Sequence, residues 1–199
     1  MDAVVASGLI GALGSIVGAL SGAALGYKLA NRSAEVSVLA NFRFTVYYLK
    51  GQFCAYLPVT IANDGAKGSV INEIQLKLKA SNGQEWLLSW QYFAAENPMA
   101  KYAWVDLERA TPILVHGNSG FQHTLKFFAV GDDPEGLSNV ALVQGKYQLI
   151  IEYRENGSAQ SVTRSYSFTV DAKISEVLET RRRDPEDNTT VIFGIKEDA

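Results

Sequence analysis

The side chains that most often do chemistry in proteins are scarce in this chain, and their spacing forms no recognised catalytic motif. Two histidines, His116 and His123, flank a glycine-containing turn, and the single cysteine is Cys54. Neither an HExxH nor a CxxC pattern accompanies them, so the spacing does not predict a zinc site. Acid–base chemistry would need His116, His123 and Asp132 to converge in the fold. Because His123 alternates with apolar residues, a histidine on a strand face is the favoured interpretation.

The remaining reactive groups also favour structural roles. Cys54 lies between Phe53 and Ala55, with only Lys50 as a nearby basic residue, which predicts an unreactive thiol. Residues 131–136 hold three carboxylates. An EF-hand spreads its ligands over about twelve positions, so an acidic turn is favoured over a calcium site. The sequence therefore predicts a protein that is not an enzyme, without catalytic residues, metal, cofactor or small-molecule substrate.

The composition excludes several other classes of protein. Hydrophobic residues make up 47% of the 199 residues and aromatic residues 11%, which argues against a disordered chain. The 18 basic and 21 acidic side chains nearly balance, so a nucleic-acid partner is not expected. One cysteine cannot form a disulfide-stapled scaffold.

An uncharged segment at residues 3–26 precedes the first lysine. It contains six Gly, six Ala, three Ser and nine Leu, Ile or Val residues. As a helix it would be about 36 Å long, enough to cross a hydrocarbon core of about 30 Å. A cleaved signal peptide is the main alternative, but it should begin with basic residues, whereas Met1-Asp2 stands here. We therefore expect a single transmembrane helix that remains attached.

The glycines of this segment fall on one face of the expected helix. At about 100° per residue they occupy an arc of about 120°, with most of the Leu, Ile and Val residues opposite. Such a face lets another helix approach closely. The four-residue spacing resembles the glycine-zipper helices of oligomeric membrane proteins, which implies a homo-oligomer or a larger membrane-protein complex. The helix-packing residues are Gly11, Gly14, Gly18, Gly22 and Gly26.

The charges that flank the span predict its orientation. Lys28 and Arg32 follow it directly, and basic residues near a span prefer the cytoplasmic side. We expect the cell membrane as the location, with a cytoplasmic C-terminal domain; a periplasmic or extracellular domain is the alternative.

Residues 34–171 change to the period-two alternation of half-buried strands. Asn156-Gly157 supplies the positive φ values of a hairpin turn, and Pro58, which has no N–H, predicts an edge strand or a bulge. Seven or eight strands without a helix between them predict an antiparallel sandwich. The strand segments are residues 42–48, 57–61, 74–78, 86–93, 121–130, 147–153 and 162–170.

Three stretches, residues 59–78, 112–120 and 145–151, resemble immunoglobulin- or fibronectin-like modules of uncharacterised single-pass bacterial membrane proteins. The paired strand cysteines of antibody domains are absent. The resemblance implies an N-terminal transmembrane α-helix followed by an all-β antiparallel immunoglobulin-like sandwich. It implies no function, because many unrelated proteins share this architecture.

Two further segments are candidates for partner binding. Residues 94–110 interrupt the strand rhythm and contain Tyr102 and Trp104; they either cap the open end of the sandwich, which is favoured, or bind a partner. After a short helix at residues 172–183, residues 189–195 read as a strand. It either pairs with its own domain, which is favoured, or is offered to a partner through Val191, Phe193 and Ile195.

The expected organisation is a membrane anchor at residues 1–33, a sandwich at 34–171 and a helix with a charged tail at 172–199. We expect a membrane-anchored interaction or scaffold module that self-associates or docks a membrane partner through its glycine-faced helix and presents the sandwich for protein binding. The alternative is a membrane-perturbing effector whose helix oligomerises into a pore under control of the sandwich.

Overall fold

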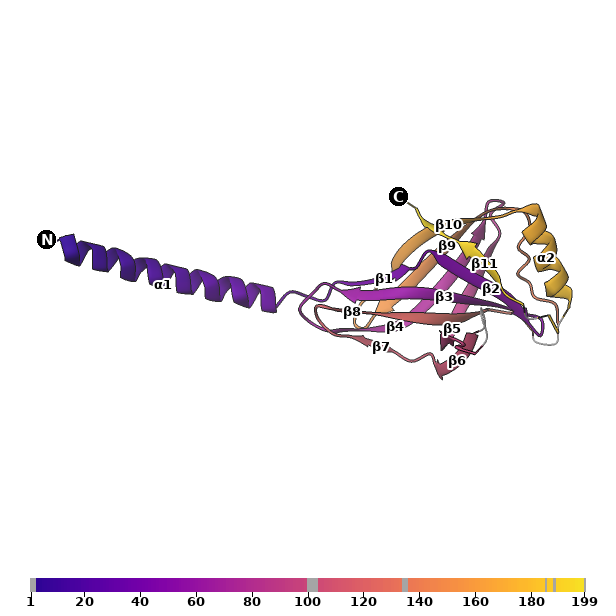
Figure 1. The fold of residues 1–199 in the computed structure, drawn as a ribbon, viewed down its shortest axis with the longest axis horizontal. Coiled ribbons are helices and arrows are strands. Elements are labelled where there is room, and N and C mark those ends of the chain that lie inside the picture. The colour runs from indigo at the N-terminus through magenta and orange to yellow at the C-terminus, as the bar shows by residue number, and fades with distance from the viewer. Residues whose placement is uncertain (1–2, 100–103, 134–135, 185, 188, 199) are drawn as a thin grey trace.

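A long N-terminal helix projects from one end of a β-sheet domain in this computed structural model, and a second helix lies at the opposite end (Figure 1). The structure describes residues 3–99, 104–133, 136–184, 186–187 and 189–198, with side chains from residue 14 onward. The helices are α1 (Ala3–Ala30) and α2 (Ala172–Arg183).

Twelve described strands form one antiparallel sheet. The strands are β1 (Val36–Ala40), β2 (Arg43–Leu49), β3 (Gln52–Asn63), β4 (Ser69–Ala80), β5 (Glu85–Glu96), β6 (Trp104–Arg109), β7 (Ile113–Val115), β8 (Ser119–Ala129), β9 (Gly145–Glu155), β10 (Val162–Val170), β11 (Val191–Gly194) and β12 (Lys196–Glu197). Their order is β11-β2-β3-β8-β5-β4-β9-β10-β12, with β1 on β3, β6 on β5 and β7 on β4.

The predicted alternation determines which side of each strand faces the core. In β4, the side chains of Ile74, Leu76 and Leu78 are at most 1% exposed. Lys79, the next residue after Leu78, is exposed. One main core lies inside the curled sheet. All described strands contribute apolar side chains to it except β6 and the short β12. Leu178 of α2 joins it, so the C-terminal helix packs on the same core as the strands.

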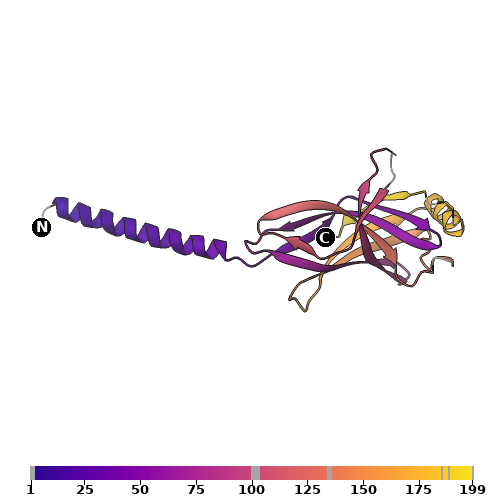
Figure 2. The ribbon, with the colours of Figure 1, turned by 90° about the horizontal axis from the view of Figure 1, so that it is seen from below.

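The expected immunoglobulin-like sandwich is wrong, because the two halves of the domain belong to one sheet. Strand β5 connects them: residues 85–89 pair with β4, and residues 88–94 pair with β8. Figure 2 shows the sheet domain from below, with α1 projecting from one end and α2 at the other. A sandwich needs two sheets without such a shared strand. The alternation identifies the strands, but it carries no information on which strands pair.

Pro58 differs from its expected place at a sheet edge. It lies within β3, which is paired on both sides, and it is opposite Thr124 of β8. On its other side β3 changes partner at this point. It pairs with β2 up to Tyr56 and with β1 from Val59 onward. The residue without an N–H therefore stands at the gap between two partner strands, where no ladder donor is needed.

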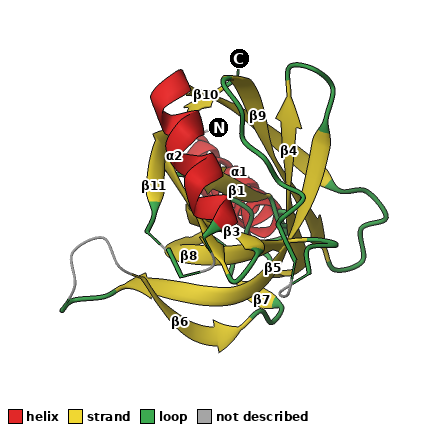
Figure 3. Ribbon diagram, turned by 90° about the vertical axis from the view of Figure 1, so that its right-hand side faces the viewer, coloured by secondary structure: helices red, strands yellow, loops and turns green. Residues whose placement is uncertain are grey.

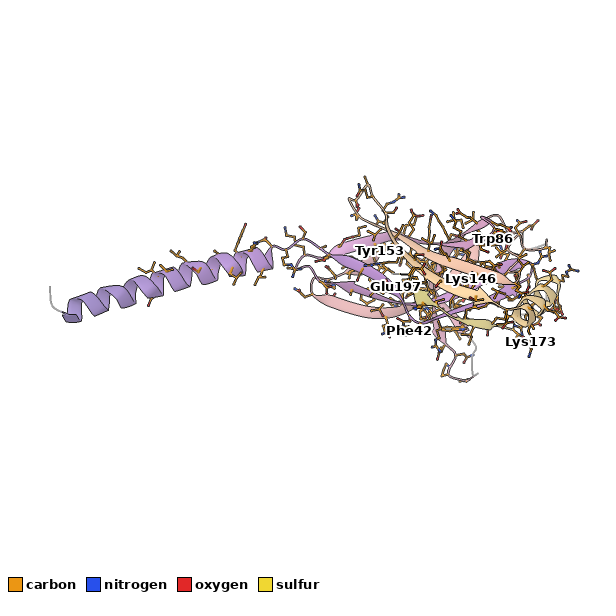
Figure 4. All side chains as sticks on the ribbon, turned by 90° about the horizontal axis from the view of Figure 1, so that it is seen from above. Phe42, Trp86, Lys146, Tyr153, Lys173 and Glu197 are labelled. Carbon is orange, nitrogen blue, oxygen red and sulfur yellow. The ribbon has the colours of Figure 1, made fainter. Side chains whose placement is uncertain are left out.

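The two ends of the curled sheet meet along a seam that the C-terminal segment closes. Strand β11 pairs with β2 at one end of the sheet, and β12, two residues later, pairs with β10 at the other. Two tyrosine hydroxyls also cross the seam: Tyr153 donates to the Val36 carbonyl at 2.8 Å, and Tyr166 accepts from the Ala40 N–H at 2.9 Å. Figure 4 labels Tyr153, Phe42 and Glu197 in this region.

Helix α2 covers the end of the domain opposite α1 (Figure 3). It has the bounds that the sequence predicts, and the Asp171 carboxylate caps it by accepting from the Ile174 N–H at 2.8 Å. Arg182 donates to the Ser138 carbonyl and to the Glu179 carboxylate. The hydrogen bond from Arg182 to Glu179 lowers the pKa of the Glu179 carboxyl to about 2. The loop after β8 is thereby tied to α2.

The expected membrane anchor is also wrong. Among the residues that the structure describes, no helix has both the length and the apolar character that crossing a membrane requires. The expectations of a single-pass membrane protein, a membrane glycine zipper and a location in the cell membrane are corrected accordingly.

Seam closure predicts that Phe193 is important for stability. Its side chain is 3% exposed and lies 5.0 Å from the Phe168 ring, so Phe193→Ala should lower the free energy of unfolding by about 3–5 kcal/mol. Ile192→Ala is the matched control, because Ile192 is 44% exposed in the same strand, and it should cost less than about 1 kcal/mol. Urea denaturation of both variants measures the difference; equal losses would contradict a seam held by the inward face of β11.

Candidate functional site

The residues that could have formed an acid–base site are not brought together. His123 and Ala129 are six residues apart in β8, which corresponds to about 20 Å, and Asp132 lies beyond the end of that strand. The Asp132 carboxylate instead accepts hydrogen bonds from the Phe53 and Asn139 N–H groups and the Ser138 hydroxyl. It therefore organises a loop.

The other reactive groups are held in unreactive forms. Cys54 is fully buried, and burial raises the pKa of its thiol to about 12, so the thiolate is not formed near neutral pH. Burial lowers the pKa of His123. Within the described part of the chain, no three His, Cys, Asp or Glu side chains gather in a way that could hold a metal ion.

A buried lysine marks the most unusual site on the sheet. Lys126 of β8 is 4% exposed and lies on the outer face, away from the main core. Its ammonium donates to both carboxylate oxygens of Asp106 in β6, at 2.9 and 2.7 Å. Four aromatic rings surround the ammonium with centroids 5.0–5.8 Å away: Tyr47, Tyr56, Tyr92 and Phe128.

Strand register builds this arrangement. Lys126 is directly opposite Tyr56 of β3 on one side and Tyr92 of β5 on the other, so the three side chains share the outer face. The Trp104 ring of β6 stacks on the Tyr56 ring, with 5.0 Å between the ring centroids. The Tyr47 ring also stacks on Tyr56, with 5.4 Å between the centroids. We call these residues the Lys126 cluster: Tyr47, Tyr56, Tyr92, Trp104, Asp106, Lys126 and Phe128.

The cluster favours a permanently charged lysine. Burial on its own would lower the pKa of Lys126, but the hydrogen bonds to Asp106 and the nearby Tyr56 outweigh burial and leave the pKa above its usual value. An ammonium that keeps its proton cannot act as a base or nucleophile near neutral pH. Its rings and carboxylate partner stabilise it in place, so the chemical effect of the cluster is to fasten β6 against the sheet.

The opposite face of the β5–β6 hairpin is apolar and exposed. Phe93 of β5 is opposite the buried Leu125 of β8, so the two side chains share the core face of the sheet. Further along β5 on the same face, Ala95 is opposite Val105 of β6, so this face extends from the core to the surface. Val105 is 41% and Leu107 55% exposed. His123 packs between the rings of Phe93 at 4.9 Å and Phe121 at 5.1 Å. We call this surface the apolar strip: Phe93, Ala95, Val105, Leu107, Phe121 and His123.

The glycines predicted to pack against another helix are open to solvent. A Cβ added at Gly14, Gly18, Gly22 or Gly26 would meet nothing within 4 Å outside the helix's own backbone. Gly11 lies in the part of α1 whose side-chain surroundings are outside the described residues. Packing through these glycines stays a prediction.

The predicted partner-binding residues have three different fates. Trp104 belongs to the Lys126 cluster, whereas Tyr102 lies outside the described residues. Val191, Phe193 and Ile195 lie in or beside β11, which pairs with β2, so the favoured intramolecular alternative describes their position.

Sequence reasoning missed Lys126, Asp106 and their tyrosines. A signal was available, since Tyr47 and Tyr56 are large aromatic residues on the face of β2 and β3 opposite the core. Aromatic residues on both faces of a strand indicate that both faces are covered. The covering strand β6 was expected to be a loop.

Comparisons with known proteins leave the family open: no family model matches the chain, and no curated protein does. A solved FixG-related protein from Vibrio parahaemolyticus is 16% identical, with 68% of this chain and 94% of that chain covered and a TM-score of 0.35. The putative ApaA protein from Bordetella pertussis is 9% identical, with 71% and 96% covered and a TM-score of 0.35.

A family 123 glycoside hydrolase from Clostridium perfringens is 14% identical; the match covers 70% of this chain, only 28% of the hydrolase, and has a TM-score of 0.37. All these TM-scores are below 0.5, so none of the three matches indicates a function for this chain.

The Lys126 cluster predicts an asymmetry between two ion pairs. Asp106→Ala leaves the Lys126 ammonium buried without its carboxylate and should cost about 2–4 kcal/mol of stability. Glu96→Ala breaks the exposed Arg43–Glu96 pair and should cost less than about 1 kcal/mol. Thermal and urea unfolding measure both.

The double variant Asp106→Ala with Lys126→Met supplies the control. It removes the buried charge together with its partner and should recover much of the loss. If it is as unstable as Asp106→Ala alone, the unpaired ammonium is not the cause.

Proposed function

We propose that this protein is a non-enzymatic interaction module that self-associates through the glycine face of α1 and presents its sheet domain for binding another protein. One observation carries the proposal: α1 stands clear of the domain, and every described residue from 14 to 33 is exposed (Figure 4).

A helix of this composition needs a partner to be stable in water. Each glycine in a helix interior costs about 1 kcal/mol relative to alanine, and α1 has glycines at positions 14, 18, 22 and 26. It also exposes large apolar side chains, with Ile16, Leu20 and Leu25 each more than half exposed. Most helical stability in proteins comes from packing. A partner that packs along α1 would supply it.

A second copy of α1 suits this surface. Residues 3–27 carry no charge, so identical helices do not repel each other. The glycines repeat every four residues, so they form one continuous stripe from Gly14 to Gly26. A two-fold contact uses the same patch on both subunits, and a uniform small-residue stripe meets that requirement.

Hydrogen bonds hold the linker between α1 and the sheet domain in a defined conformation. The buried Asn63 side chain accepts from the Glu35 N–H at 3.0 Å and donates to the Lys67 carbonyl at 2.8 Å. The Lys67 N–H donates in turn to the Arg32 carbonyl at 3.1 Å. Gly65 packs so closely against this linker that an added Cβ would lie 1.9 Å from the Ser33 carbonyl oxygen. The domain is therefore joined to α1 by an ordered linker.

The proposal predicts that Gly18→Ile with Gly22→Ile abolishes self-association of the full chain. Two isoleucines on the stripe would hold the helices apart, while isoleucine raises rather than lowers helix propensity relative to glycine. Sedimentation equilibrium should give an oligomer for the unmodified chain and the 21.7 kDa monomer for the variant.

Ala23→Ile with Ala24→Ile is the matched control, because both positions lie outside the glycine arc. This variant also places two isoleucines on α1, but outside the stripe, and should remain oligomeric. An unmodified chain that sediments as a monomer, or a glycine variant that still assembles, would overturn the proposal.

A further inference from the structure

Three dipeptides of this chain carry the groups for a reaction of the backbone with itself. They are Asp64-Gly65, Asn82-Gly83 and Asn156-Gly157. In each, the backbone nitrogen of the glycine can attack the side-chain carbonyl carbon of the residue before it, because glycine has no Cβ to hinder the approach. The nitrogen must lose its proton to react. The fold therefore decides which dipeptide reacts, through the hydrogen bonds of the glycine N–H and of the attacked side chain.

The first dipeptide is held inside the linker region at the base of α1. The Gly65 N–H donates to the Asn63 side-chain oxygen at 3.0 Å, and the Asp64 N–H donates to the Glu35 carbonyl at 3.1 Å. The backbone of Gly65 also lies directly against the Ser33 carbonyl. This nitrogen is neither free nor exposed to the movement that ring closure requires.

The second dipeptide lies in the turn between β4 and β5, where both reacting groups are engaged. The Gly83 N–H closes the turn by donating to the Ala80 carbonyl at 2.9 Å. The Asn82 side-chain oxygen accepts from the Gln84 N–H at 3.0 Å. Both hydrogen bonds must break before the Gly83 nitrogen can reach the Asn82 side chain.

The third dipeptide lies one position earlier in its turn, between β9 and β10. Here the Ser158 N–H closes the turn by donating to the Glu155 carbonyl at 3.2 Å. Gly157 stands before the closing donor, with a φ of +78°. Among the hydrogen bonds of the described residues, none uses the Gly157 N–H. The turn therefore leaves this nitrogen open to water.

The Asn156 side chain is also weakly held. Its oxygen accepts from the Asn72 side-chain amide at 3.5 Å, which is longer than an ordinary hydrogen bond. Both Asn156 and Gly157 are exposed. The Asn156 N–H donates to the Val70 carbonyl at 2.7 Å, which anchors the backbone of the turn without restraining the side chain.

We infer that Asn156 is a site of spontaneous deamidation and that hydrogen bonds protect Asn82. The deprotonated Gly157 nitrogen forms a bond to the Asn156 side-chain carbonyl carbon, the bond from that carbon to Nδ2 breaks, and ammonia leaves with the proton. Water then opens the resulting five-membered imide. Cleavage of the new bond gives aspartate, and cleavage of the original peptide bond gives isoaspartate, in which the chain runs through the side-chain carbon.

Either product changes the turn between β9 and β10. A negative charge appears next to Glu155, whose carboxylate accepts from the Ser69 hydroxyl at 2.7 Å. Isoaspartate also adds a methylene group to the backbone of the turn. The modification needs no enzyme and is independent of self-association through α1.

Peptide mapping of the full chain tests the inference after incubation at mildly alkaline pH. Trypsin releases residues 155–164 with Asn156 and residues 80–101 with Asn82. Mass spectrometry should show the mass gain of an amide that has become a carboxylate. Asn156 should convert at least about fivefold faster than Asn82, because at Asn82 hydrogen bonds must break first. Equal rates, or faster conversion of Asn82, would overturn the inference.

The same measurement in concentrated urea is the control, because unfolding frees both glycine nitrogens. The two rates should then agree within about twofold, whereas a preference for Asn156 that persists in urea would come from the local sequence and contradict protection by the fold. Asn156→Ser should abolish the mass gain in residues 155–164. A gain that remains in this variant would place the reaction at Gln160 and equally count against Asn156.

Discussion

The domain depends on the closure of one long sheet. Residues 191–197 pair first with β2 and then with β10, which are the two ends of the sheet path, so the last part of the chain bridges a gap that the rest of the sheet cannot close. Phe193 enters the core at this point, and Tyr153 and Tyr166 satisfy backbone groups of β1 across the same seam. Buried backbone groups need such partners. The inner faces of the strands can form one core only when this seam is closed.

Closure leaves β6 as a protruding edge, and the ion pair between the buried Lys126 and the exposed Asp106 holds β6 against the sheet. Lys126 is costly to bury, and Asp106 and four rings offset that cost. The result is a strand with two different faces: one is fixed to the sheet, and the other carries exposed Val105 and Leu107. A rigid, half-apolar edge at one flank and a projecting helix at the end of the domain are consistent with a protein that acts by contact with other chains.

The local features were largely readable from the sequence, and the long-range ones were not. Alternation predicted the buried face of β4, and Asn156-Gly157 predicted the β9–β10 turn, where Gly157 has a φ of +78°. Pairing of β5 with both β4 and β8 depends on tertiary contacts, so the sheet was mistaken for a sandwich. Lys126 and Asp106 are twenty residues apart in different strands, and no periodicity relates them. The membrane anchor was inferred from composition, and the described part of α1 does not support it.

We propose that copies of this protein meet along the glycine stripe of α1, which runs from Gly14 to Gly26. Oxidative cross-linking tests it directly, because the native Cys54 is buried and an introduced cysteine on α1 would be the accessible thiol. With G22C we expect rapid formation of a disulfide-linked dimer, and with A24C, outside the stripe, we expect slow or no cross-linking. Equal cross-linking at both positions, or none at residue 22, would contradict it.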